Sequence, residues 1–223
     1  MKTIIFNASP RKNWSTYKLL KEAEAGAAAA GSDTEFINLY DYKFQGCISC
    51  LVCKRKGNTC GGLCAVRDDI RPILENTLDA DVLIFGSPVY LHGATAQLRA
   101  FLERLLFPIT SYTVDENGVR TRCLDKTVRT GIIYTMNNVP KVASARNYET
   151  LLGINRDLLK GVYGHSEMMW VHNTWQFTDY DKYDANMFDV KEKKRVLEEE
   201  FPVSLGLAYE FGKKLVSKPI ICH

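Results

Sequence analysis

Residues 2–31 read KTIIFNASPRKNWSTYKLLKEAEAGAAAAG and contain three kinds of segment in close succession. The β-branched and aromatic residues at 2–6 predict a strand, and the polar residues at 7–13 predict a loop. The Ala-, Leu-, Lys- and Glu-rich residues at 15–30 predict a helix that ends at Gly31. Because a strand followed by a short loop and a helix is the repeating unit of a parallel sheet, this opening stretch indicates an α/β fold.

The same alternation continues along the chain. Further strands are expected at 34–38, 81–86, 126–135 and 167–172. Helices are expected from Asp68 or Asp69, as N-cap, to about 78, at 95–106, at 143–162, and in a C-terminal region that Pro202 divides. Five strands that alternate with helices predict a parallel sheet with right-handed crossovers and helices on both faces.

Length and composition favour one domain over residues 1–223. The chain is 46% hydrophobic and 25% charged with a net charge of +3, which is typical of a soluble globular protein. Two insertions interrupt the alternation. One is a Cys-rich segment at 45–66, and the other, at 107–126, is predicted to be hairpin-like with a turn at Asn117-Gly118.

Several classes of protein are disfavoured by the same data. No apolar run approaches the ~20 residues of a membrane span, and the apolar part of the N-terminus is too short for a signal peptide. No basic stripe suits nucleic acid. We therefore expect a cytoplasmic protein that binds neither a membrane nor a nucleic acid.

The loop after the first strand has the composition of an anion-binding site. It places the start of the next helix at the carboxyl edge of the sheet, where free N–H groups and the helix dipole favour an anion. Ser9, Ser15 and Thr16 add hydroxyl groups, and Arg11 adds a guanidinium group. Walker A and G-x-G-x-x-G patterns are both absent. A capped helix start with solvated basic residues is the alternative interpretation.

A second loop, GSPVYLHGA at 86–94, follows the third expected strand. In a doubly wound sheet of order 2-1-3-4-5, the first and third strands are neighbours, and ligands bind beside their carboxyl ends. The backbone amides and the aromatic ring of Tyr90 suit a planar ligand. The alternative is a simple connection from strand to helix.

Together the two loops resemble a known family. SPRKNWSTYKLL at 9–20 looks like the SPRK-x-G-N-T phosphate loop of the flavodoxin-like NAD(P)H-dependent FMN reductases. GSPVYLHGATAQLRAFLERL at 86–105 is similar to the T-P-V-Y segment of that family, which continues through Q-[LM]-K to D-R. The resemblance implies a flavodoxin-like, three-layer α/β/α fold with a five-stranded parallel sheet of order 2-1-3-4-5.

The resemblance also implies a bound FMN and the residues that contact it. Those implied at the FMN phosphate are Ser9, Arg11, Ser15 and Thr16. Those implied at the isoalloxazine ring are Pro88, Val89, Tyr90 and Leu91. A third contacting loop is implied at Met136, Asn137 and Asn138. The chain departs from the family pattern where Trp14-Ser15 replaces Gly-Asn and where Met136-Asn137 replaces a Gly-containing loop. Because the flavin carries the chemistry, no residue is assigned a catalytic role.

Five of the seven cysteines lie between positions 47 and 64, in a segment that follows the second strand and so leaves the sheet at the same edge as the two loops. Two-residue gaps let thiolates converge on one metal centre. The spacing resembles the compact Cys motif of iron–sulfur flavoproteins, a branch of the same fold family. It implies a [4Fe–4S] cluster on Cys47, Cys50, Cys53 and Cys60, with Cys64 as the alternative fourth ligand. A zinc site and metal-free thiols are the other interpretations.

The implied function is that of an FMN-dependent oxidoreductase. It would accept electrons from NAD(P)H or a ferredoxin-like donor and pass them to a small acceptor or a redox protein, with or without a cluster. A flavodoxin-like electron carrier is one alternative, which the pI near 8.4 and the insertions disfavour. A zinc-binding regulatory module is another. Relatives of this kind imply a homodimer or homotetramer.

Overall fold

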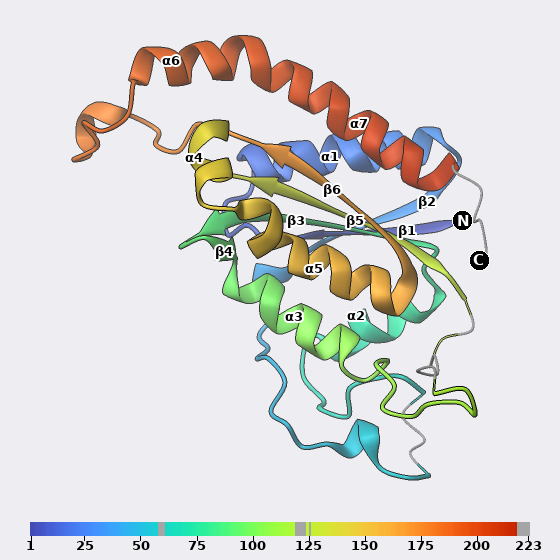
Figure 1. The fold of residues 1–223 in the computed structure, drawn as a ribbon. Coiled ribbons are helices and arrows are strands. Elements are labelled where there is room, and N and C mark those ends of the chain that lie inside the picture. Colours follow the sequence, from blue (N-terminus) through green and yellow to red (C-terminus); the bar gives the residue numbers. More distant parts are fainter. Residues whose placement is uncertain (58–60, 119–123, 125, 218–223) are drawn as a thin grey trace.

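The computed structural model describes residues 1–57, 61–118, 124 and 126–217. A parallel sheet forms its centre (Figure 1). The sheet consists of β1 (Lys2–Asn7), β2 (Asp33–Asn38), β3 (Val82–Tyr90), β5 (Val128–Thr135) and β6 (Gly164–Val171). The strand order is β2-β1-β3-β5-β6, and a two-residue strand β4 (Gly93–Ala94) pairs antiparallel with β3. Apart from β4, which the sequence did not predict, the strands have the expected 2-1-3-4-5 order. The predicted flavodoxin-like fold class is confirmed.

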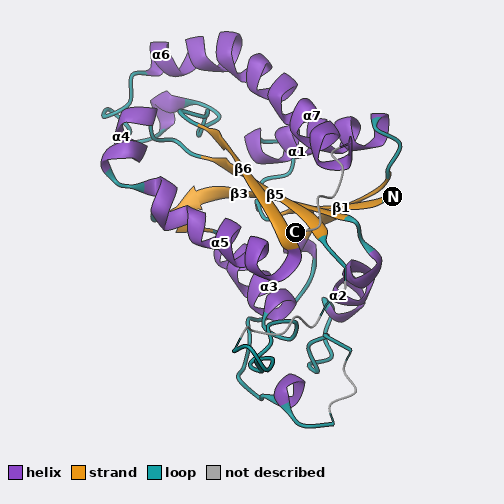
Figure 2. Ribbon diagram, turned by 45° about the vertical axis from the view of Figure 1, so that its right-hand side comes forward, coloured by secondary structure: helices purple, strands orange, loops and turns teal. Residues whose placement is uncertain are grey.

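Helices cover both faces of the sheet (Figures 1 and 2). One face carries α1 (Ser15–Ala29), α6 (Val190–Arg195) and α7 (Phe201–Ser217). The other carries α2 (Arg71–Asn76), α3 (Ala96–Leu106), α4 (Pro140–Ala145) and α5 (Tyr148–Tyr163). Side chains of a strand alternate between the faces, so Ile4 and Phe6 of β1 join one apolar cluster and Ile5 joins the other. A sheet that is buried on both faces explains the apolar runs at 4–6 of β1 and 82–85 of β3.

Helices α1 and α7 are in backbone contact. A Cβ atom on Gly212 of α7 would lie 1.9 Å from the carbonyl oxygen of Ala23 in α1, and one on Gly26 would lie 1.9 Å from that of Tyr209. Only glycine allows this close approach. None of the described helices is long and apolar enough to cross a membrane.

Two expected helices differ in the structure. Helix α2 begins at Arg71 without a side-chain cap, because Asp68 pairs with Arg104 and Asp69 accepts a hydrogen bond from the backbone N–H of Lys43. The predicted N-cap was therefore wrong. The helix expected at 143–162 is two helices, α4 and α5, which are separated at Asn147, where φ is +54°.

Pro202 does not divide the C-terminal helical region as predicted. It lies in the first turn of α7, directly after the π-helical segment η5 (Val196–Glu200), and the ribbon continues from α6 to α7 (Figure 1). A proline lacks the N–H that an α-helix requires, and the wider π-helical turn changes the hydrogen-bond pattern at that point. The residue alters the helix type without breaking the helix.

The two insertions lie below the sheet in Figure 1. A short 3-10 turn, η1 (Leu39–Asp41), precedes the Cys-rich segment, and a second, η2 (Val52–Lys54), lies within it. A third, η3 (Thr77–Asp79), extends α2. A fourth, η4 (Tyr180–Lys182), follows β6. Near the turn expected at Asn117-Gly118, Gly118 N donates to Asp115 O over 3.1 Å and closes a turn over residues 115–118. The returning arm of the expected hairpin, at 119–123 and 125, lies outside the described residues.

Candidate functional site

A pocket opens at the carboxyl edge of the sheet, where the segments after β1, β3, β5 and β6 meet. It is lined by Ser9, Arg11, Trp14, Ser15, Thr16, Pro88, Val89, Tyr90, Thr135, Met136, Asn137, Thr174, Trp175 and Gln176. The lining includes every residue implied for FMN except Leu91 and Asn138. Trp14, Thr135 and the segment 174–176 line it without having been predicted.

The loop after β1 is held by bonds between its own side chains and backbone. Ser9 N donates to Asn7 Oδ1 over 3.1 Å, and Arg11 N donates to Ser9 Oγ over 3.2 Å. Short polar side chains compete with regular structure in this way and stabilise a turn. Ser9 is buried as a result, and its hydroxyl oxygen accepts a hydrogen bond from within the loop.

The N-terminus of α1 opens into this pocket. Trp14 is its N-cap residue, and no side chain of the described residues caps it. By contrast, Thr95 caps the neighbouring helix α3, with its Oγ1 accepting from Leu98 N over 3.3 Å. The uncapped N–H groups and the dipole of α1 make this end of the pocket suitable for an anion.

Charge in the pocket has one sign. Arg11 stacks its guanidinium group 4.5 Å from the centre of the Trp14 ring and donates a hydrogen bond to the carbonyl oxygen of Gln176. It therefore joins the loop after β1 to the segment after β6. No aspartate or glutamate is among the described lining residues, so nothing there offsets the positive charge.

The hydroxyl of Thr16 faces the sheet. Thr16 Oγ1 and Thr135 Oγ1 are 2.7 Å apart, and both residues are buried. This bond fixes the first turn of α1 to the end of β5. Thr16 thus lines the pocket with a hydroxyl group that already has one partner.

The turn between β3 and β4 forms another wall. Tyr90 is 47% exposed and Leu91 is 98% exposed. Leu91 and His92 both have left-handed backbone angles, with φ of +47° and +68°, as a two-residue hairpin turn requires. This conformation is strained in residues other than glycine. A hydrogen bond between His92 Nδ1 and Tyr148 Oη, 2.7 Å apart, holds the turn in place.

The segment after β6 was missed because it carries no motif. Its only sequence signal is an aromatic run from Trp170 to Tyr183, which also suits core packing. In the structure, Asn137 Nδ2 donates to Gln176 Oε1, so this segment is bonded to the loop after β5. Asn137 Oδ1 is buried and has no hydrogen-bond partner among the described residues.

A second, smaller cavity lies between the Cys-rich segment and the C-terminal turns of α3. Cys47, Cys50, Cys53 and Cys64 all line it. Burial raises the pKa of the Cys53 thiol; Lys54 opposes this rise, and the thiols of Cys64, Cys47 and Cys50 add to it. The four thiols therefore share one environment. Within the described ranges, no three potential ligands are close enough to bind a metal ion, and Cys60 lies outside those ranges.

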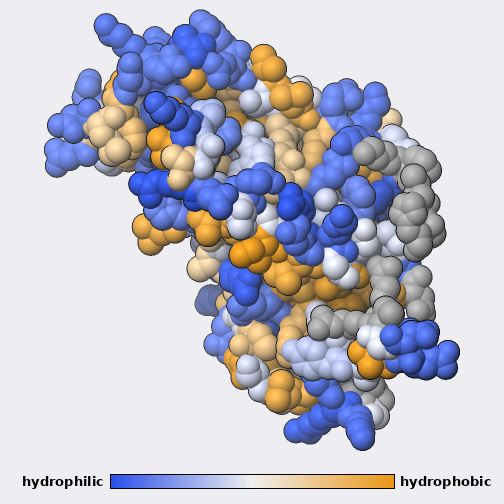
Figure 3. All heavy atoms as spheres, in the orientation of Figure 1, coloured by the Kyte–Doolittle hydropathy of each residue, from blue (hydrophilic) through white to orange (hydrophobic). Residues whose placement is uncertain are grey.

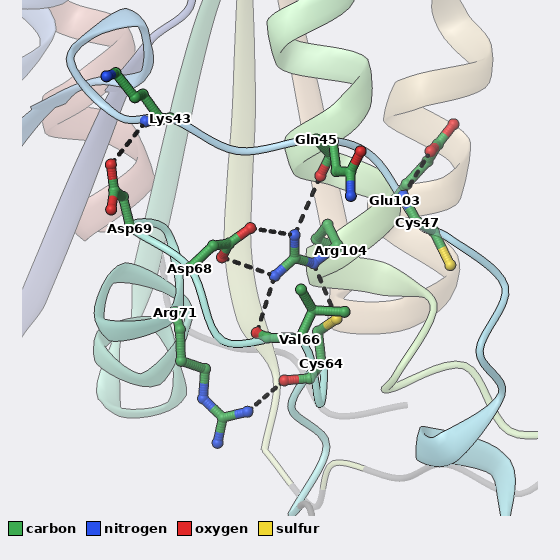
Figure 4. A network of polar contacts seen from close by, with 10 residues as sticks. All are labelled: Lys43, Gln45, Cys47, Cys64, Val66, Asp68, Asp69, Arg71, Glu103 and Arg104. Carbon is green, nitrogen blue, oxygen red and sulfur yellow. Dashed lines mark hydrogen bonds and ion pairs between the residues drawn. The ribbon is translucent and has the colours of Figure 1, made fainter.

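Arg104 of α3 holds both ends of the Cys-rich segment (Figure 4). Its guanidinium group is fully buried and donates to Asp68 in two bonds of 2.9 and 3.0 Å. It also donates to the carbonyl oxygens of Gln45 at 3.1 Å and Val66 at 3.2 Å. Its Nε donates to Cys64 Sγ over 2.9 Å, so one cation both closes the segment and contacts a thiol.

Two further contacts attach the segment to α3. Glu103 accepts a hydrogen bond from Cys47 N over 3.2 Å, and Lys54 Nζ donates to carbonyl oxygens at the helix end, including that of Pro108 at 3.4 Å. The thiols consequently lie at the C-terminal end of α3, whereas its N-terminal end lies by the loop after β1, where the Thr95 hydroxyl donates to Ala8 O over 2.9 Å. Since 11 residues of α-helix span about 16 Å, the cysteines do not lie at the carboxyl edge as expected.

Fold and pocket together define a flavodoxin-like α/β protein with an anion-favouring ligand site at its switch point. Residues 1–121, just over half of the chain, match the NADPH-dependent FMN reductase family. The chain belongs to this family, which confirms the resemblance drawn from its loops.

Curated relatives match between a quarter and about half of the chain. An iron-sulfur flavoprotein of Methanocaldococcus jannaschii is 40% identical over 104 residues, which are 47% of this chain and 51% of that protein. An FMN-dependent NADH:quinone oxidoreductase of Bradyrhizobium is 36% identical over 56 residues, 25% of this chain and 28% of that protein. The chain spans about half the length, or less, of the curated relatives it matches.

Solved structures match over nearly the whole chain. An NAD(P)H:quinone oxidoreductase from Methanothermobacter marburgensis has a TM-score of 0.68 at 18% identity, covering 96% of this chain and 98% of that one. An FMN-dependent NADH-azoreductase from Bacillus anthracis has a TM-score of 0.63 at 16% identity, covering 97% and 99%. At this identity the likeness establishes the shared fold.

Proposed function

We propose that this protein is an FMN-dependent oxidoreductase that is reduced by NAD(P)H and passes electrons to a small acceptor. The observation that carries the proposal is the pocket at the carboxyl edge, where an uncapped helix N-terminus, Arg11 and a half-exposed aromatic residue meet and where the described lining residues include no carboxylate. FMN has the matching chemistry, since it joins a phosphate dianion to a planar ring. Family membership and the FMN-dependent relatives support the same conclusion.

In this proposal the chain binds and orients the flavin. The start of α1 and the side chains of Ser9 and Arg11 hold the phosphate, while Pro88, Val89 and Tyr90 lie along the ring. The loop at Met136 and Asn137 and the segment 174–176 form the opposite wall. Bound FMN would supply hydride acceptance and the release of electrons singly or in pairs. Leu91, which does not line the pocket, has the exposure needed to contact an incoming substrate.

The phosphate assignment is tested by FMN titration of matched variants. Replacing both Ser9 and Arg11 by Ala should weaken FMN binding by about 2–4 kcal/mol, the sum of a neutral and a charged hydrogen bond to the phosphate. Lys12→Ala is the control, because Lys12 is an exposed neighbour that pairs with Asp41 at 2.7 Å and does not line the pocket. Equal FMN affinity in the double variant and the control would overturn the assignment.

Nicotinamide oxidation separates the enzyme from an electron carrier. FMN-loaded protein should oxidise NADH or NADPH in repeated turnovers when a quinone or an azo dye is present as acceptor. A carrier of the flavodoxin type would bind FMN and show no such turnover. A protein that binds zinc and no flavin would refute both functions.

We also propose that the four thiols of the second cavity hold a [4Fe–4S] cluster, which requires them to draw closer together than they lie among the described residues. Three observations support it: the thiols line one cavity, α3 anchors the segment at both ends, and the Arg104 guanidinium can offset thiolate charge. The contact between Arg104 and Cys64 favours Cys64 over Cys60 as the fourth ligand. The M. jannaschii relative carries the name iron-sulfur flavoprotein.

Iron and sulfide analysis of anaerobically purified protein tests the cluster. About four of each per chain are expected. Cys64→Ser should lower both contents while FMN stays bound, and Cys60→Ser should retain them. The reverse result would assign Cys60 instead, and iron-free protein from iron-replete anaerobic cells would exclude the cluster.

The assembly and location follow from the same proposal. We propose a homodimer or homotetramer, which light scattering of the purified protein would test. A cluster on partly exposed thiols requires reducing surroundings, so we propose a cytoplasmic location, which cell fractionation would test.

A further inference from the structure

Lys193 of α6 is a buried cation directly behind the wall of the pocket. Its side chain is 2% exposed, although the surface around α6 is mostly hydrophilic (Figure 3). Its ammonium group donates to Asn173 Oδ1 at 2.8 Å, to Thr174 O at 3.3 Å and to Asn137 O at 3.4 Å. Phe188 lies beneath it, with its ring centre 5.2 Å from Nζ.

All of these partners are neutral. In the described part of the chain, no carboxylate makes an ion pair with Lys193, and the adjacent Glu192 pairs instead with Arg195 at 2.7 Å. Burial lowers the pKa of the Lys193 ammonium to about 8. A buried charge without a counter-ion destabilises a fold, and such groups gather where the charge has a function.

The position of Lys193 links it to the pocket. Asn137 and Thr174, whose carbonyl oxygens it binds, both line the pocket, on the wall formed by the segments after β5 and β6. Arg11 and the start of α1 supply positive charge from the loop after β1. The pocket thus receives positive charge from two separate elements, the loop after β1 and α6. A phosphate bound at the start of α1 explains the first charge and leaves that of Lys193 without an assigned role.

We propose that Lys193 is a positioning residue whose buried charge favours the reduced form of the flavin, an inference that rests on the proposed FMN site. The oxidised ring is neutral. Hydride transfer from a reduced nicotinamide delivers two electrons and one proton, so the ring gains one negative charge while the nicotinamide is oxidised. A fixed cation in a poorly solvated wall stabilises that charge without reorganising. Lys193 lies outside residues 1–121, so this buried charge belongs to the part of the chain that the family match does not cover.

Matched variants separate the effect of the charge from the effect of the structure. Lys193→Met removes the charge and the donor. Lys193→Gln removes the charge and keeps an N–H donor that can reach the Asn173 side chain. Lys194→Met is the control, because Lys194 is an exposed neighbour on the same helix, 3.8 Å from Glu198. The measurements are the dissociation constant of oxidised FMN and the two-electron midpoint potential of bound FMN.

Both Lys193 variants should lose at least tenfold in their preference for reduced over oxidised FMN. That change lowers the midpoint potential by about 30 mV for a two-electron couple. The Lys194 variant should keep the wild-type potential, and so should Lys193→Arg, which retains the charge.

Equal weakening of oxidised and reduced FMN in the Lys193 variants would overturn the proposal, since it would indicate a structural role alone. If Lys193→Met fails to fold or to hold FMN, the potential of Lys193→Gln decides, and an unchanged value there overturns the proposal. Wild-type protein that binds no FMN would instead refute the proposed function, so the two failures are distinguishable.

Discussion

The pair formed by Arg104 and Asp68 should be the most sensitive ionic contact outside the pocket. We predict that Asp68→Asn destabilises the protein strongly, while Asp69→Asn, one residue further on, does not. Asp68 accepts two hydrogen bonds from a guanidinium group that is fully buried. Asp69 is exposed and accepts one bond, from Lys43 N at 3.0 Å.

The magnitude follows from burial. Removing one partner of a buried ion pair costs about 3–5 kcal/mol, because the remaining charge is left unpaired. The side chain of Asp68 is 20% exposed, and Arg104 keeps its bonds to Gln45 O and Val66 O. Water and these carbonyl groups compensate in part, which reduces the expected loss to about 2–4 kcal/mol. Asp69→Asn should stay within about 0.5 kcal/mol of wild type.

Urea unfolding followed by tryptophan fluorescence and circular dichroism measures both variants. In thermal unfolding of a chain of this length, the expected loss of unfolding free energy in Asp68→Asn lowers the melting temperature by about 5–12 °C. The double variant Asp68→Asn/Arg104→Met tests the pairing, since its loss should be at least about 1 kcal/mol smaller than the sum of the two single losses. Equal stability of Asp68→Asn and Asp69→Asn, or additivity in the double variant, would refute the reasoning.

Three further predictions concern the pocket and the packing. Tyr90→Ala should weaken FMN binding and shift the flavin absorbance, with little change in melting temperature because the residue lies half-exposed in a turn. Tyr112→Ala is the control, at a residue that is 67% exposed and does not line the pocket, and it should leave FMN binding and the flavin absorbance unchanged. Gly212→Ala should destabilise by more than about 2 kcal/mol in urea unfolding, since its Cβ would overlap the backbone of α1, whereas Gly206→Ala in the same helix meets open space and should be neutral or stabilising. The pKa of Lys193 is lowered from 10.5 to about 8 in the folded protein, so between these pH values the unfolded chain binds more protons than the folded one. The stability of wild type relative to Lys193→Met should therefore rise between pH 8 and pH 10.5, by at most about 1.4 kcal/mol per pH unit. A flat difference between their urea midpoints from pH 8 to pH 10 would contradict the lowered pKa.

Short stretches of sequence are enough to predict the central strands and the loops that line much of the pocket. The apolar runs of β1 and β3 follow from burial on both faces, and the polar loop after β1 leads directly into a helix rich in Ala, Leu, Lys and Glu. The βα alternation predicts a parallel sheet with right-handed crossovers. The strand order came from the resemblance to the flavodoxin-like family, and the structure has it. Apart from Trp14, the residues that line the pocket from the loops after β1 and β3 could be named from the resemblance of these loops to the family, as could Met136 and Asn137 after β5.

Local patterns failed where a residue had a choice of partners. Asp68 suits a helix N-cap by composition, but Arg104, 36 positions away, offers a buried bidentate contact that is worth more. The helix expected across 143–162 is interrupted at Asn147, which adopts the left-handed conformation that asparagine tolerates.

Tertiary structure alone decided the remainder of the site. The segment 174–176 joins the pocket because β6 is the edge strand beside β5, and Lys193 reaches the wall because α6 folds back over that edge. The cysteines follow β2 in sequence, yet the contacts of Glu103 and Arg104 hold them at the far end of α3. Sequence determines what a residue can bind through spacing and side-chain type, whereas burial and contacts between distant residues exist only once the chain has folded, and these decide which of its possible partners it meets.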